Sequence, residues 1–350
     1  MLSALCCAAL MLPACGGSGT PSNPASPTAP PATTPTPPPA PTTEFTHLPI
    51  DLSVVERINP LGHMSAIFDA ALGRSTSATL PAARIYMVLT SRGSHPVIAP
   101  AAGTVTWMLG PKPDFRIEVE VSPGLKYFVD HVLPEPGIAV GARVDAGQRI
   151  AVHGGFSCCL DFGVLNDAIR AGYINPRRYS PQVMNADGPI KYFNETLRSQ
   201  LYSKVYRVAD GLDGRHDYDR PGRLVGNWFL EGTPEDGALL PEHWLKYLVF
   251  AYSNTHPSLI LVSITGTLDL PGLYAIQTGG MDPADVSVTS GLVSYRLVQK
   301  EPNVSEGDGT GRTVGVLLVQ MLTDTQIRVE VFPGNSTAMQ FTSGAKIYTR

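Results

Sequence analysis

The apolar runs of this chain are short, and glycine or proline interrupts them at close intervals. Between residues 84 and 165 such runs follow one another, and Phe115–Val121 alternates strictly between apolar and polar residues. Strict alternation places every second side chain on one face, as in a half-buried antiparallel strand. A mainly β domain is therefore expected at residues 46–205. Its expected strands are 84–91, 95–109, 115–123, 126–133, 147–154 and 158–165.

A second set of alternating runs follows the turn-rich, charged segment 213–229, which marks a boundary. Six or seven strands at this spacing predict an antiparallel β-sandwich or barrel at residues 210–350. A helical pattern is expected only around residues 192–206, in the last part of the first β domain. The expected strands of the second domain are 244–252, 258–265, 272–279, 291–299, 313–322 and 325–332.

The N-terminal segment predicts export from the cytoplasm. Residues 1–14 form an apolar stretch too short to span a bilayer, and Leu12-Pro13-Ala14-Cys15 resembles a bacterial lipobox. We expect cleavage before Cys15 and a lipid on its thiol; an ordinary secretory leader is the alternative. Residues 15–45 are dense in Pro and Thr, so they are expected to form an extended tether without a core. The net charge of -4 and the absence of a Lys/Arg cluster argue against nucleic-acid binding.

Several segments of the first β domain, in this order, resemble successive signatures of the lysostaphin-like zinc endopeptidases. They are "INPLGHMS", "TLPAARIYM", "PVIAPAAGTVTWM", "YFVDHV", "GARVDAGQRIAVHGG" and "CLDFGV", within residues 58–170. The glycine-rich hairpin also occurs in biotinyl and lipoyl domains, but here it lacks the lysine that would carry the cofactor. The resemblance implies a small twisted antiparallel β-sandwich.

The resemblance also implies where a metal site would lie. In the family a His and an Asp near the first strand and the second His of an HxH motif hold zinc. The first HxH His and the His after "Y." act on water and the oxyanion. Here His131 matches the "Y.H" position, while Cys159 and Asp161 stand at the two HxH positions. Arg84 stands at the metal-binding His position, and a guanidinium has no lone pair for zinc. We expect an Arg84–Asp161 ion pair instead, no metal, and four vestigial positions: Arg84, His131, Cys159 and Asp161.

An alternative ligand set remains open at this point. His63 lies six residues before Asp69, and these two residues with Asp161 would supply three zinc ligands. Cys159 would then be a fourth ligand or a thiol base. However, residues 62–79 are expected to form a loop or helical turn rather than a strand, which favours a solvated His63. Cys158 and Cys159 are adjacent, so no structural disulfide between them is expected.

These patterns favour a non-catalytic lipoprotein of the bacterial cell envelope, lipid-anchored or secreted. Its degenerate endopeptidase-like domain would bind peptidoglycan or a partner protein, and no cofactor is expected. The alternative is a zinc-dependent cell-wall endopeptidase with remodelled metal ligands. No cluster of His, Cys or carboxylates in residues 210–350 indicates a further catalytic site.

Overall fold

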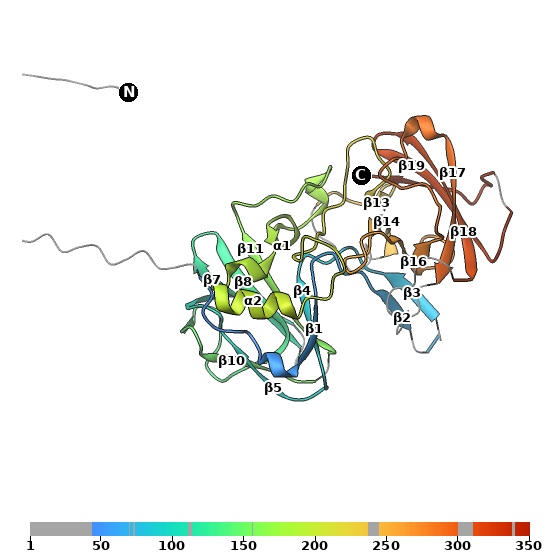
Figure 1. Cartoon of the computed structure of the whole chain (residues 1–350). Coiled ribbons are helices and arrows are strands. Elements are labelled where there is room, and N and C mark those ends of the chain that lie inside the picture. The colour runs from blue at the N-terminus through green and yellow to red at the C-terminus, as the bar shows by residue number, and fades with distance from the viewer. Residues whose placement is uncertain are drawn as a thin grey trace, which may run out of the picture. The chain divides into compact units, whose positions relative to one another are not determined.

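The computed structural model describes residues 44–69, 71–72, 74–110, 114–155, 157–236, 245–299, 311–337 and 340–350. The expected leader, Cys15 and nearly all of the expected tether at 15–45 lie outside these residues. The described chain is mainly antiparallel β, which confirms the predicted fold class (Figure 1). No helix among the described residues has the length and apolar character needed to cross a bilayer.

The first β part is built around one sheet with the order β1-β4-β11-β8-β7-β6-β9. In addition β10 pairs with both β5 and β8, and the short β12 pairs with β11. All of these pairings are antiparallel. The strands are β1 (Val55–Asn59), β4 (Ile85–Leu89), β5 (His95–Ile98), β6 (Gly103–Leu109), β7 (Phe115–Ser122), β8 (Leu125–Pro134), β9 (Arg143–Val144), β10 (Arg149–His153), β11 (Cys159–Asn166) and β12 (Ala186–Asp187).

The period-2 pattern divides this sheet into a core face and an opposite face. On β11, Leu160, Phe162 and Val164 point into the hydrophobic core, where they meet Tyr127 and Val129 of β8. The intervening residues of β11 therefore point to the other face of the sheet, which carries the candidate site described below.

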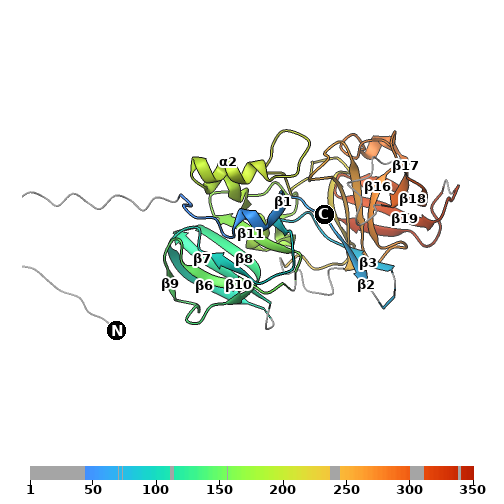
Figure 2. The ribbon, with the colours of Figure 1, turned by 60° about the horizontal axis from the view of Figure 1, so that its bottom comes forward.

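Helices are few and short. The predicted helix around 192–206 is confirmed as α2 (Glu195–Ser203), which lies beside the sheet in both views (Figures 1 and 2). The side chain of Asn194 caps it by accepting a hydrogen bond from the Leu197 amide at 3.0 Å. Leu201 of α2 is buried in the core of the sheet. The other helical elements are α1 (Pro181–Met184) and the 3-10 turns Leu52–Val54, Pro176–Arg178, Pro189–Tyr192 and Val288–Ser290.

The prediction of a loop or helical turn at residues 62–79 is wrong. This segment forms a β-hairpin of β2 (Ala66–Asp69) and β3 (Arg74–Ala78), paired only with each other. The hairpin is held by tertiary contacts: the Tyr247 hydroxyl donates to the Ala78 carbonyl at 2.7 Å, and Ser263 Oγ donates to the Thr79 carbonyl at 2.8 Å. Both donors lie more than 160 residues away in the sequence. The residues of the hairpin itself, many of them Ser and Thr, therefore carry no local pattern that predicts two strands.

The second β part is a closed barrel of eight strands within the described residues. Each strand pairs with the next, and β13 pairs with β20 through Phe229–Thr349 and Leu230–Tyr348, which closes the barrel. Its interior is filled by apolar side chains such as Phe250, Tyr295 and Leu317. The strands are β13 (Gly226–Leu230), β14 (Tyr247–Tyr252), β15 (Ile260–Ile264), β16 (Gly272–Ile276), β17 (Leu292–Gln299), β18 (Thr313–Thr323), β19 (Gln326–Pro333) and β20 (Lys346–Thr349).

Trp228 and Arg350 occupy the junction where the barrel closes. The Arg350 guanidinium carbon lies 4.0 Å from the centre of the Trp228 ring. Arg350 also donates hydrogen bonds to the backbone carbonyls of Val225 and Arg220, each at 2.9 Å. Through Nη1 and Nη2, the buried Arg350 guanidinium ties the segment that precedes β13 to the residue that follows β20.

We expect Arg350→Ala to destabilise the protein by about 2 to 4 kcal/mol, because charged hydrogen bonds and a desolvated cation–π contact are lost together. Urea denaturation followed by tryptophan fluorescence measures this loss. Arg143→Ala, at an exposed position of β9, is the control and should cost less than about 0.5 kcal/mol. Equal stabilities of the two variants would contradict a closing role for Arg350.

Candidate functional site

The candidate site is centred on Asp161, on the face of the sheet opposite the core. Asp161 lies in β11, between β4 and β8, directly opposite Tyr86 on one side and Asp130 on the other. Its side chain is 1% exposed. A buried carboxylate in the middle of a sheet is costly unless cations or hydrogen-bond donors compensate its charge.

Arg84 supplies the first compensating charge. It immediately precedes β4, and its Nε donates to Asp161 Oδ2 at 2.6 Å, so the predicted Arg84–Asp161 ion pair is present in the structure. The guanidinium also lies over the ring of Tyr86, 5.3 Å from the ring centre. The Arg84 side chain remains 32% exposed, so one end of the ion pair faces the surface.

His131 supplies the second charge, and a β-bulge directs it toward Asp161. On the β7–β8 pairing, Phe115 faces Val132 and Ile117 faces Val129, which leaves one extra residue in β8. His131 adopts φ 65°, a left-handed conformation that non-glycine residues rarely take. Its Nε2 lies 3.6 Å from Asp161 Oδ2, and its Nδ1 lies 3.1 Å from Asp114 Oδ1.

The mutual interactions of Arg84, Asp161 and His131 favour the charged form of each side chain. Burial by itself raises the pKa of Asp161, but Arg84 and His131 outweigh it and hold the pKa below its usual range. Hydrogen bonding to Asp161 raises the pKa of His131 to about 9, against the opposing effect of burial. His131 is therefore an imidazolium at neutral pH, and both of its ring nitrogens are donors.

A second ion pair lies beside the first on the same face. Arg116 Nε lies 3.2 Å from Glu118 Oε1, and Arg116 Nη1 lies 3.5 Å from Asp130 Oδ2. The guanidinium covers the ring of Phe128 at 3.5 Å. Gly163 makes room for that ring, since a Cβ at Gly163 would lie 2.3 Å from it. The sequence reasoning missed these residues, although the alternation of Phe115–Val121 already placed Arg116 and Glu118 on one face.

Two adjacent cysteines lie beside the site, at the start of β11. Both thiols are free; Cys158 is exposed and Cys159 is buried. Burial and a hydrogen bond between the two thiols raise the pKa of Cys159, with the hydrogen bond as the larger effect. The sequence reasoning also missed His153, which is fully buried with its Nε2 3.1 Å from the Cys159 carbonyl oxygen. The signal for it in the sequence was its position directly after the apolar residues 150–152. His153 holds the start of β11 in place and contacts backbone rather than the Asp161 carboxylate.

The alternative ligand set is spread over separate elements. His63 lies next to the site, because its ring packs edge-to-face on Tyr86 with centres 5.1 Å apart, and its Nε2 lies 3.1 Å from Ser65 Oγ. Asp69, in contrast, ends β2, which pairs only with β3 and not with the strand that carries Asp161. Across the described part of the chain, no group of three or more His, Cys, Asp or Glu side chains has the spacing to hold a metal ion.

The residues around Asp161 do not fit the zinc that the resemblance implies. Arg84 has no lone pair, and its Nε sits at hydrogen-bond distance from the carboxylate oxygen that would have to bind the metal. The raised pKa of His131 removes the neutral imidazole that zinc requires. The other oxygen, Asp161 Oδ1, is buried and has no hydrogen-bond partner among the described residues. One open carboxylate oxygen cannot replace three ligands.

No protein-family model and no curated protein matches the chain. Among solved structures it is similar to Csd3 of Helicobacter pylori, at 15% identity and a TM-score of 0.29, over 46% of this chain and 40% of that one. It is also similar to the SpoIIQ–SpoIIIAH pore forming complex, at 15% identity and a TM-score of 0.30, over 44% and 93%. A zinc containing peptidase from Vibrio cholerae matches at 21% identity and a TM-score of 0.26, over 35% and 37%. Similarities at this level carry no argument about function, which rests on the residues of this chain.

A double-mutant cycle tests the ion pair. Arg84→Ala should destabilise the protein by about 2 to 4 kcal/mol, because it leaves the buried Asp161 charge with a weaker partner. Arg84→Ala combined with Asp161→Leu should recover most of this loss, since the orphaned charge is then removed. Arg57→Ala, which breaks the exposed Arg57–Glu56 pair, is the control with an expected cost below about 1 kcal/mol. Additive losses in urea denaturation would contradict the coupling.

The titration of His131 gives a second test. The folded-state pKa of about 9 exceeds the ordinary 6.5, so the ion pair with Asp161 contributes its full stability below pH 6.5 and loses it as the pH rises through 9. Asp161→Asn should lower the pKa of His131 toward 6.5, as measured by NMR titration of the imidazole. A wild-type pKa near 6.5, or no change in the variant, would show that the charged pair does not form.

Proposed function

We propose that this protein is a non-catalytic component of the bacterial cell envelope whose peptidase-like sheet binds peptidoglycan or a partner protein. The observation that carries the proposal is the Arg84–Asp161 ion pair, which occupies the place where the family resemblance implies zinc. Without a metal to activate water, the site lacks the nucleophile of zinc-dependent hydrolysis. The face of the sheet around Asp161 then presents charged side chains that can bind a ligand but cannot hydrolyse it by a zinc mechanism.

The exposed groups of this face support binding. The side chains of Arg84, His131 and Asp114 are 32%, 33% and 43% exposed, so they present two cations and one carboxylate on the same face. The donors of Arg84 and His131 suit carbonyl and carboxylate oxygens, while Asp114 suits amide or ammonium groups. Peptides, including the stem peptides of peptidoglycan, offer both kinds of partner.

An apolar row beside the charges supports an extended ligand. Pro96, Val152 and Leu133 lie directly opposite one another across β5, β10 and β8. Their strand neighbours Val97, Ala151 and Val132 point into the core, so this row lies on the face of Asp161. Leu133 is 43% exposed. An exposed apolar patch bordered by polar groups is a feature of interaction surfaces.

The envelope location in the proposal rests on the sequence. Cleavage before Cys15 and lipidation of its thiol would anchor the protein. The Pro/Thr-rich segment 15–45 would then hold the β domains away from the membrane. A tether of this kind suits a protein that binds a ligand beyond the bilayer surface.

Two assays on the mature protein test this function. Incubation with cross-linked muropeptides and added zinc should release no product, whereas a zinc-stimulated cleavage product would establish the endopeptidase alternative. Sedimentation with protein-free sacculi should retain the protein. Arg84→Glu should weaken that retention about tenfold or more, while Arg143→Glu, a charge reversal at an exposed position of the edge strand β9, should not.

The sacculus assay also separates the two ligand classes. Retention on protein-free sacculi that depends on Arg84 identifies peptidoglycan as the ligand. No retention, together with Arg84-dependent crosslinking to one envelope protein in cells, identifies a protein partner. Retention that is equal in both charge-reversal variants would contradict binding through this face.

A further inference from the structure

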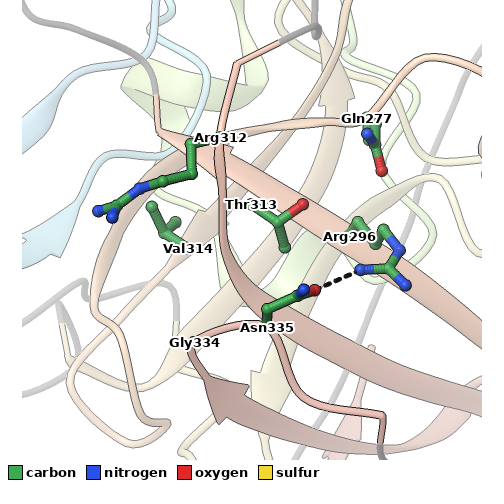
Figure 3. A pocket seen from close by; sticks show the side chains of 7 residues that line it. All are labelled: Gln277, Arg296, Arg312, Thr313, Val314, Gly334 and Asn335. Atoms are coloured by element: carbon green, nitrogen blue, oxygen red, sulfur yellow. Dashed lines mark hydrogen bonds between the residues drawn. The ribbon is translucent and has the colours of Figure 1, made fainter.

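A second candidate site lies on the barrel, away from the Asp161 site. A cavity of about 540 Å³ opens where the ends of several barrel strands meet (Figure 3). Gln277 follows β16, Arg296 lies in β17, Thr313 begins β18, and Asn335 follows β19. The volume falls in the range of small-molecule sites in proteins. The remaining lining residues are Arg312, Val314 and Gly334.

The charged residues that line this cavity are both arginines. Arg296 and Arg312 both line it, and none of the carboxylates that the structure describes lies within salt-bridge distance of either guanidinium. Among the described residues, two cations therefore line one concavity with no ion-paired carboxylate, an arrangement whose positive potential attracts anions. By contrast, Arg84 and Arg116 of the first β part both have carboxylate partners.

Arg296 is held in position within the cavity. Its Nη1 donates to Asn335 Oδ1 at 2.6 Å, an interaction drawn in Figure 3. The turn that carries Asn335 is itself fixed, because the Gly334 amide donates to the Val314 carbonyl at 2.7 Å and Gly334 adopts φ 79°. An oriented guanidinium loses less side-chain entropy when it binds a ligand than a free one does.

The neutral polar groups of the cavity indicate which other chemical groups the anionic ligand carries. Gln277, Thr313 and Asn335 offer amide and hydroxyl groups, which donate to and accept from ligand hydroxyls and amides. Val314 supplies the apolar part of the lining. This set of groups matches a small molecule that combines an oxyanion with several hydroxyls, rather than a bare ion or an apolar ligand.

We propose that this cavity binds a small, hydroxyl-rich oxyanion, such as an acidic or phosphorylated sugar, with its charged group on Arg296 and with Arg312 adding positive charge at the other side of the cavity. Planar guanidinium groups pair with both carboxylates and phosphates through two parallel hydrogen bonds. The inference goes beyond the proposed function of the Asp161 site and does not depend on it.

Three matched hexoses test the site: glucose, glucuronate and glucose 6-phosphate. Each is titrated into the mature protein at constant low ionic strength, and binding is followed by chemical-shift changes of the arginine Nε–H signals. Glucuronate or glucose 6-phosphate should bind with dissociation constants at least tenfold lower than glucose. Preference for one of the two anions identifies the charged group as carboxylate or phosphate, and either preference supports the site.

The variants Arg296→Gln and Arg312→Gln should each weaken anion binding about fivefold or more. Arg143→Gln, an exposed change with the same loss of net charge on β9, is the control and should leave binding unchanged. Equal binding of all three hexoses would overturn the proposal. So would an equal loss in all three variants, because the attraction would then come from net charge alone.

Discussion

The first β part of this protein depends on the charge of one buried carboxylate. Asp161 lies in a central strand with its side chain 1% exposed, directly opposite a second carboxylate, Asp130. Two facing carboxylates would repel each other if cations did not separate them. Arg84, directly before β4, pairs with Asp161 of β11, and Arg116 of β7 lies beside Asp130 of β8, so the opposite charges on this face compensate one another. The arrangement is a cross-strand electrostatic network.

This network explains why the site differs chemically from a zinc site. A metal ion and a guanidinium can each neutralise a buried carboxylate, but only the metal leaves an open position for water. Arg84 links the start of β4 to β11 through Asp161, and a guanidinium offers no open coordination position for water. The β-bulge directs His131 toward the same carboxylate, where its positive charge adds to that of Arg84.

The sequence predicted those parts of the structure that local patterns encode. Alternating runs predicted most strands, and the segments "TLPAARIYM" and "CLDFGV" together predicted the contact between Arg84 and Asp161. The bulge at His131 was not predictable, because one extra residue in a strand leaves the alternation almost intact. The β2–β3 hairpin was missed because its stability comes from donors such as Tyr247, which lie far away in the sequence. The closing contact of Arg350 with Trp228 was missed for the same reason.

The barrel adds a second surface whose chemistry differs from that of the sheet. At the Asp161 site every cation has a carboxylate partner, whereas the cavity of Arg296 and Arg312 has a net positive lining among the described residues. The unsuitability of the Asp161 site for zinc is tested most directly by measuring zinc in the protein, purified without chelators, by native mass spectrometry. The account predicts no bound zinc in the wild type and none in Asp161→Ala. One zinc per chain that is lost in Asp161→Ala would contradict it.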